Sequence, residues 1–252
     1  MKHSHIAWTD HSFNPWSGCS RVSPGCTDCY AAVHVSTLIR GIEWGPKADR
    51  VRSTSTWNDP PRWNREAERE GRRARVFCAS LADVFDTHRQ VAPWRDELHT
   101  LIEGTPNLDW LVLTKRPEVA EDYYRRRPVP KNVWLGTTCE DQTRADQRIP
   151  ILLRVAAKVR FVSCEPVLGP LDIERHLGVG KITWVICGGE TTFNNQQIHR
   201  PMNLQWARSL REQAKRRKVA FFFKQIGGRG RAGRDAAGTL LDGREHLEVP
   251  RS

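Results

Sequence analysis

Six short apolar runs recur along the chain and constrain its fold more than any other feature. Each run is rich in β-branched or aromatic residues, and successive runs begin 22 to 37 residues apart, about the length of one βα unit. Near-continuous hydrophobic strands are typical of a parallel sheet that is covered on both faces. The runs are residues 75–78 (RVFC), 110–113 (WLVL), 132–135 (NVWL), 159–162 (VRFV), 182–187 (ITWVIC) and 219–223 (VAFFF).

The intervals between these runs contain patterns typical of amphipathic helices. The second expected helix begins with Pro117, which suits a first helical turn. A further strand is expected at residues 6–8 or near Phe13. This alternation predicts an α/β fold, a partial (β/α) barrel with six or seven mostly parallel strands. The expected helices span residues 91–103, 117–127 and 204–217.

The length of 252 residues suits one domain of this class. We expect the barrel to occupy residues 1–228, with residues 41–74 as an insertion or lid, and a basic, Gly/Arg-rich tail over residues 229–252. No apolar run approaches the roughly 20 residues that a membrane span needs, and the first residues lack an apolar signal core. The sequence therefore predicts a cytoplasmic protein with no membrane partner.

Three of the seven cysteines, Cys19, Cys26 and Cys29, crowd into a C-x6-C-x2-C segment beside glycines. An odd number of cysteines excludes a complete disulfide framework, and close cysteines in a reducing compartment indicate a metal. Three thiolates leave one site of a [4Fe–4S] cluster open, which is the favoured hypothesis. The alternative is a structural zinc ion with His11 or His34 as the fourth ligand.

Polar or reactive residues follow each apolar run. Because the carboxyl ends of parallel strands meet at one rim, these residues are expected to line a polar pocket. Ordinary loop chemistry is the alternative for any single one. The segments are Ala79-Ser80-Leu81-Ala82-Asp83, Thr114-Lys115-Arg116, Thr137-Thr138-Cys139-Glu140-Asp141, Ser163-Cys164-Glu165-Pro166, Gly188-Gly189-Glu190 and Lys224-Gln225.

Positive charge is concentrated at the C-terminal end. The chain carries a formal net charge of +11, and its part from Pro201 onward holds 12 Lys and Arg against 5 Asp and Glu. Such a surface attracts phosphate backbones, although a solvated helix end is the alternative. Trp57 and Trp63 are candidates to stack on a base. The basic residues are Lys215, Arg216, Arg217, Lys218, Arg229, Arg231 and Arg234.

An ordered set of motifs resembles a phage- and bacteria-borne family of radical S-adenosylmethionine (SAM)-like proteins, distantly similar to spore photoproduct lyase. The motifs are IAWTDHSFNPWSGCSRVSPGCTDCYA, VFCASLADVFD, WLVLTKRP, VWLGTTCED, FVSCEPVLGPLD, WVICGGE and FFFKQIGG, between Ile6 and about Gly228. The resemblance implies a partial barrel of the radical SAM type, a [4Fe–4S] cluster on Cys19, Cys26 and Cys29, and SAM on the fourth iron. Most radical SAM enzymes use C-x3-C-x2-C, a shorter first gap than the one here.

The resemblance also implies roles for the strand ends. Ser80 and Lys115 are candidates to contact the methionine part of SAM, and Asp83 and Glu165 its amino group or ribose hydroxyls. Gly188, Gly189 and Glu190 are assigned to ribose or substrate, although Glu190 could instead cap the following loop. Cys78, Cys139 and Cys164 lie at strand ends as candidate hydrogen-atom donors, with buried packing as the alternative.

The activity implied is reductive cleavage of SAM to a 5′-deoxyadenosyl radical that modifies or repairs a nucleic-acid base or nucleotide. An external electron donor would be needed, with a partner protein as a further expectation. One alternative is a radical SAM enzyme that acts on a peptide or small metabolite. The other is a non-catalytic nucleic-acid-binding protein stabilised by zinc or a cluster.

Overall fold

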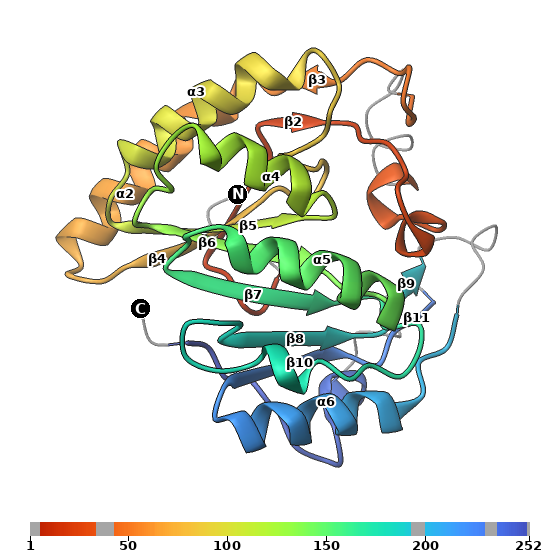
Figure 1. Cartoon of the computed structure of the whole chain (residues 1–252). Coiled ribbons are helices and arrows are strands. Elements are labelled where there is room, and N and C mark those ends of the chain that lie inside the picture. Colours follow the sequence, from red (N-terminus) through yellow and green to blue (C-terminus); the bar gives the residue numbers. More distant parts are fainter. Residues whose placement is uncertain (1–5, 34–42, 193–199, 230–235, 251–252) are drawn as a thin grey trace. The chain divides into compact units, whose positions relative to one another are not determined.

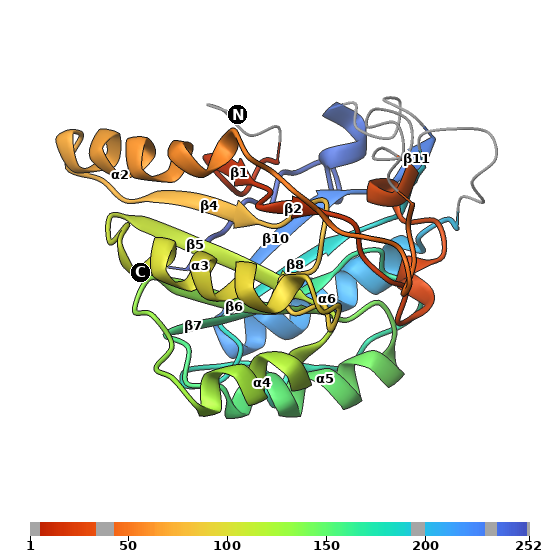
Figure 2. The ribbon, with the colours of Figure 1, turned by 90° about the horizontal axis from the view of Figure 1, so that it is seen from above.

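The computed structural model describes residues 6–33, 43–192, 200–229 and 236–250 (Figures 1 and 2). The chain divides into two compact units. The first unit comprises Met1–Arg21, Ala31–Leu135 and Val155–Lys158, and the second comprises Val22–Tyr30, Gly136–Arg154 and Val159–Ser252. In the described part of the chain, no helix has both the length and the apolar character that a bilayer crossing requires.

A seven-stranded sheet has the order β1-β4-β5-β6-β7-β8-β10. The pairs β1–β4, β4–β5, β7–β8 and β8–β10 are parallel, which confirms the α/β class and a partial barrel of the expected six or seven strands. The strands are β1 (His11–Phe13), β4 (Ala74–Cys78), β5 (Leu108–Thr114), β6 (Val133–Thr138), β7 (Val159–Cys164), β8 (Trp184–Gly188) and β10 (Ala220–Gln225).

Two short strand pairs accompany the main sheet. In the first unit, β2 (Trp16–Ser17) pairs antiparallel with β3 (Val51–Arg52), and β2 leads directly into the cysteine segment. In the second unit, β9 (Thr191–Thr192) pairs parallel with β11 (Gly228–Arg229). The second pair therefore joins the two segments that follow the polar ends of β8 and β10.

Helices occupy the intervals between the main strands. In the second unit, α6 packs on β8 and β10 (Figure 1). The Asn203 side chain caps its start by accepting a hydrogen bond from the Gln205 amide, and Lys218 ends it in the left-handed conformation. The helices are α2 (Asp59–Arg69), α3 (Val91–Glu103), α4 (Pro117–Arg125), α5 (Gln142–Arg154) and α6 (Leu204–Arg217), with 3₁₀ turns η1 (Pro24–Cys26), η2 (Thr56–Asn58), η3 (Glu174–His176) and η5 (Ala236–Thr239).

The observed bounds differ from the expected ones at a few points. The helices α3 and α6 have the bounds expected, whereas α4 ends at Arg125. The additional strand is near Phe13, as β1, and not at residues 6–8. The strands β6 and β7 continue into the polar segments, where Thr137, Thr138 and Ser163 are almost completely buried.

The segment expected as an insertion contains a helix that packs against the main sheet. In the first unit, α2 packs on β4 and β5 (Figures 1 and 2). Its Trp63 is 1% exposed and stacks on the His11 ring at 4.3 Å, so burial removes Trp63 as a candidate base-stacking residue. Trp57 contacts Phe13 edge-on at 5.6 Å, and the Arg52 guanidinium lies over the Trp57 ring.

Gly136, inside β6, is required by the packing of the second unit. A Cβ atom at this position would lie 2.4 Å from the ring of Phe161, and Phe161 is itself fully buried against Trp184. Because the ring has no free space to move into, an added methyl group must displace packed side chains. The absence of a side chain at Gly136 therefore allows β6 and β7 to share this layer.

We expect Gly136→Ala to lower the free energy of unfolding by about 1–3 kcal/mol, the usual cost of overpacking a core. Gly169→Ala is the matched control, since a Cβ there meets no atom within 4 Å and its backbone is outside the left-handed region. Urea denaturation of both variants measures the difference. Equal stability of Gly136→Ala and the parent protein would show that Phe161 does not fill this space.

Candidate functional site

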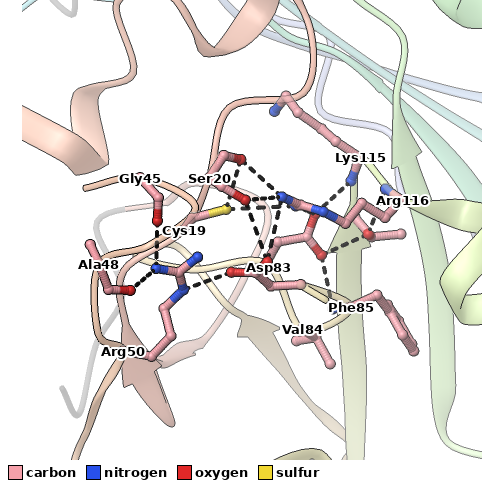
Figure 3. Close-up of polar contacts among 12 residues, drawn as sticks. Cys19, Ser20, Gly45, Ala48, Arg50, Asp83, Val84, Phe85, Lys115 and Arg116 are labelled. Atoms are coloured by element: carbon pink, nitrogen blue, oxygen red, sulfur yellow. Dashed lines mark hydrogen bonds and ion pairs between the residues drawn. The ribbon is translucent and has the colours of Figure 1, made fainter. Parts of the chain in front are cut away.

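In the first unit, the ends of β4 and β5 bring together Asp83 and Arg116 (Figure 3). The Arg116 Nη1 atom lies 2.9 Å from Asp83 Oδ2, and both side chains are buried. Asp83 also accepts hydrogen bonds from the Thr114 hydroxyl and from the backbone amides of Phe85 and Lys115. Four donors thus occupy a carboxylate that has about four lone-pair positions.

Arg116 connects this carboxylate to the first cysteine of the segment. Its Nη2 atom donates to the carbonyl and the hydroxyl of Ser20 at 2.9 and 2.8 Å. Its Nη1 atom lies 3.7 Å from Cys19 Sγ, within the range of an N–H···S hydrogen bond (Figure 3). The planar guanidinium therefore fixes both the backbone beside Cys19 and the sulfur itself.

A second buried ion pair supports the same segment. Arg50 Nε lies 2.7 Å from Asp86 Oδ2, and Arg50 Nη1 donates to the carbonyls of Gly45 and Ala48 (Figure 3). The Gly45 amide in turn donates to the Cys19 carbonyl at 3.1 Å. Both pairs therefore hold the chain around Cys19 mainly through backbone atoms.

Opposing effects act on the pKa of the Cys19 thiol. Burial raises the pKa of the Cys19 thiol to about 12, and the negative charge of Asp83 adds to this effect, whereas Arg116 lowers it. Burial alone would lower the pKa of Arg116, but Asp83 and Cys19 raise it above its usual value. Arg116 is therefore a permanent cation beside the thiol.

The other two residues assigned in this unit lie at the same strand ends. The Ser80 amide and hydroxyl donate to Asn14 Oδ1 at 2.8 and 3.1 Å, so Asn14 holds the chain that leaves β4. Lys115 is half-buried, and its ammonium group points away from Asp83 (Figure 3). A role for Ser80 and Lys115 in SAM binding stays a prediction.

In the second unit, Glu140 and Arg148 form an ion pair at 2.8 Å, with Glu140 fully buried. The other oxygen of Glu140 accepts from the Gly25 amide at 3.2 Å, and a Cβ on Gly25 would lie 3.1 Å from this carboxylate. Arg148 also donates to the Thr138 carbonyl. A side chain at position 25 would therefore crowd the buried carboxylate where the cysteine segment passes it.

Glu190 and Arg200 form the other pair in the second unit. Arg200 Nε donates to Glu190 Oε2 at 2.9 Å, and Arg200 Nη1 donates to the Pro24 carbonyl at 3.0 Å. Glu190 thus holds the segment before Cys26 through Arg200. Its assignment to ribose or substrate is not tested by this contact.

The glycines beside Glu190 allow two backbones to approach closely. A Cβ on Gly189 would lie 1.8 Å from the Ile226 carbonyl oxygen, and Gly227 has a φ of +92°. Gly188, at the end of β8, instead faces Glu165, whose carboxylate pairs with the Lys224 ammonium. Glu165 and Lys224 are partly exposed, at 18% and 26% of their side chains.

The candidate hydrogen-atom donors Cys78, Cys139 and Cys164 are all fully buried. Burial raises the pKa of each thiol above its ordinary value, so all three are neutral at physiological pH. Complete burial is typical of cysteines that pack in a core. Their role as donors stays a prediction.

The three cysteines of the segment are free thiols, Cys26 buried and Cys19 and Cys29 half-buried. Cys19 belongs to the first unit, and Cys26 and Cys29 to the second. Among the described residues, no group of three or more His, Cys, Asp or Glu side chains is arranged to hold a metal ion. His34, the alternative zinc ligand, and the basic residues Arg231 and Arg234 lie outside the described residues.

Three of the arginines around this segment carry contacts that the sequence did not predict. Arg116 and Glu140 stand at strand ends and were expected only to line a rim, and Arg148 and Arg200 were not singled out. A usable signal was the position of an acid within five residues of the ends of β4, β6 and β8. The arginine that pairs with each acid follows it in the chain, by 33, 8 and 10 residues.

Two solved structures are similar to this chain. The first is a double mutant of spore photoproduct lyase with bound AdoMet and dinucleoside spore photoproduct, with a TM-score of 0.47, 10% identity and coverage of 84% of this chain and 62% of that one. The second is a point mutant of spore photoproduct lyase, with a TM-score of 0.45, 11% identity and coverage of 81% and 60%. The chain thus spans about three fifths of the length of these structures.

No curated protein matches the sequence. A family model, in contrast, matches almost the whole chain, from residue 3 to residue 250. Its printed description is "Protein of unknown function (DUF5131)". The chain belongs to the DUF5131 family.

Proposed function

We propose that this protein is a radical SAM enzyme in which Cys19, Cys26 and Cys29 hold a [4Fe–4S] cluster. The observation that carries the proposal is the way the cysteine segment is held. Arginine–carboxylate pairs bind its backbone at Ser20 in the first unit, and at Pro24 and Gly25 in the second. Each part of this 11-residue stretch with three free thiols is thereby held within its own unit without a disulfide.

The residues present suit a cluster in their chemistry. Thiolates are the protein ligands of iron–sulfur clusters, and three of them leave one iron for a non-protein ligand. The Arg116 guanidinium, 3.7 Å from Cys19 Sγ, is a donor of the kind that tunes a cluster through its sulfurs. The segment carries no nearby fourth cysteine, so the thiol set matches an incompletely ligated cluster better than a four-cysteine zinc site.

When bound, the cluster and SAM would supply a 5′-deoxyadenosyl radical at the expense of one electron from an external donor. The protein would bind, orient and shield the reactants. We assign the carboxylate of SAM to Lys115, and its methionine part also to Ser80. Glu165 and Lys224 are half-buried at strand ends beside Gly188, and they offer both hydrogen-bond acceptors and donors to the ribose or substrate.

Asp83 and Glu190 receive a different role in this proposal. Both acids are engaged with arginines that bind the cysteine segment. We assign them to holding that segment in place. Direct contact of either acid with SAM or substrate stays a prediction.

We propose a nucleic-acid base or nucleotide as the target. The support is the net charge of +11, of which the part from Pro201 onward contributes +7. Such an excess of positive charge raises the local concentration of phosphate-bearing substrates.

Replacing Cys19, Cys26 or Cys29 by Ala is expected to abolish cluster binding, because each change removes one of three protein ligands. Cys187→Ala is the control, since Cys187 is fully buried inside β8. Iron and sulfide content after anaerobic purification, with the visible absorbance, measures the outcome. A full cluster in the triple-alanine variant would refute the ligand assignment.

Lys115→Ala is expected to weaken SAM binding by about 1.5–3 kcal/mol, the range for a hydrogen bond to a charged group. Iron content should not change. The matched control is Lys131→Ala, an exposed lysine before the start of β6. Calorimetry of the reconstituted protein gives the affinity, and unaltered binding in Lys115→Ala would show that Lys115 has no contact with SAM.

The reaction itself is tested by release of 5′-deoxyadenosine. We expect release that depends on a reductant, is lost in Cys26→Ala, and is stimulated by nucleotides or oligonucleotides. Stimulation by peptides but not by nucleotides would move the target to the peptide class. An iron-loaded protein that never cleaves SAM would contradict the proposed activity.

A further inference from the structure

A cavity of about 510 Å³ lies in the second unit beside the C-terminal end of α6. Its volume is in the range of small-molecule sites. Its walls come from α6, from the start of β10 and from the chain after β11. They include Arg211, Lys215, Lys218, Val219, His246 and Val249.

This cavity is separate from the strand ends described above. It touches Ala220 and Phe221, the first residues of β10, whereas Lys224 and Gln225 end that strand. Four residues of extended chain span roughly 13 Å. The cavity therefore lies at the opposite end of β10 from the Glu165–Lys224 pair.

The four basic residues at the end of α6 lie in two different environments. Arg216 and Arg217 bind the two oxygens of Glu174, at 2.7 and 3.4 Å. Lys215 and Lys218 instead line the cavity, and neither forms an ion pair within the described residues. The four consecutive cations therefore supply two ammonium groups to the cavity.

The other charged side chains that line the cavity have partners within the protein. Arg211 pairs with Asp242 at 2.9 Å and with Glu212 at 3.1 Å. Glu248 accepts a hydrogen bond from the Phe221 amide at 3.1 Å. Against this single carboxylate of the lining, the two lysines leave an excess of positive charge.

His246 adds a polar group that has no partner in the described part of the chain. Its Nε2 atom is buried and unbonded, while its ring contacts Phe221 at 5.9 Å and its carbonyl accepts from the Phe223 amide. The imidazole ring is therefore part of the cavity wall, together with the two lysines.

We propose that this cavity binds the phosphate group of a nucleotide. Lys215 and Lys218 supply donors for a phosphate, and Val219 and Val249 supply an apolar wall for the sugar and base. The C-terminal dipole of α6 disfavours an anion at this end of the helix. The Lys218 amide reduces this effect because it binds the carbonyls of Ala214 and Lys215.

The site does not depend on the cluster or on SAM, so binding can be measured without the proposed reaction. The phosphate can belong to a free nucleotide or to the end of a nucleic-acid strand. Isothermal calorimetry of the full chain with inorganic phosphate, AMP, and a short oligonucleotide with and without a 5′-phosphate distinguishes the two sources.

The test variant combines Lys215→Gln with Lys218→Asn, since asparagine tolerates the left-handed backbone at position 218. The control combines Arg216→Gln with Arg217→Gln, which removes the same charge from the same helix end. We expect the test variant to bind AMP or the 5′-phosphorylated strand at least tenfold more weakly, and the control to bind within threefold of the parent.

Equal weakening in both double variants would mean unspecific attraction by net charge and would overturn the site. The absence of binding of every probe to the parent protein would overturn it as well. Thermal denaturation checks that both double variants are folded. The release of 5′-deoxyadenosine without added substrate is expected to be unchanged in the test variant, so failure of this site leaves the proposed reaction standing.

Discussion

Four ion pairs between arginines and buried carboxylates are the constraint on which the site depends. Charges removed from water must be paired, and separating a buried pair typically costs about 3–5 kcal/mol. Each pair therefore has a fixed position. The polar atoms that are not needed for the ion pair form hydrogen bonds with the backbone of other segments. The pairs are Asp83–Arg116 and Asp86–Arg50 in the first unit, and Glu140–Arg148 and Glu190–Arg200 in the second.

These pairs change which polar groups are available to a ligand. Asp83 accepts four hydrogen bonds within the protein, and Glu190 is bound to Arg200. Partly exposed groups at the strand ends include Lys115 in the first unit and Glu165 with Lys224 in the second. Acids at the ends of the strands thus divide into those that organise the protein and those that can meet a reactant.

The fold was more predictable from the sequence than the site. Continuous apolar runs predicted the strands because each strand is largely buried on both faces, and Pro117 marked the start of a regular helix. The helix α5 was not expected, since Pro150 inside it interrupts the usual signal. The sequence located the acids after β4, β6 and β8 but not their partners, because Glu190 and Arg200 or Asp83 and Arg116 meet only in the folded chain.

The contacts on the cysteine segment are made to its backbone: to the carbonyls of Cys19, Ser20 and Pro24 and to the amide of Gly25. The side chains of Arg21 and Val22, between these points, are exposed. Relatives should therefore tolerate almost any residue at these two positions. Evolution at this segment would then preserve the arginines and acids that bind its backbone more strictly than the side chains that the segment itself exposes.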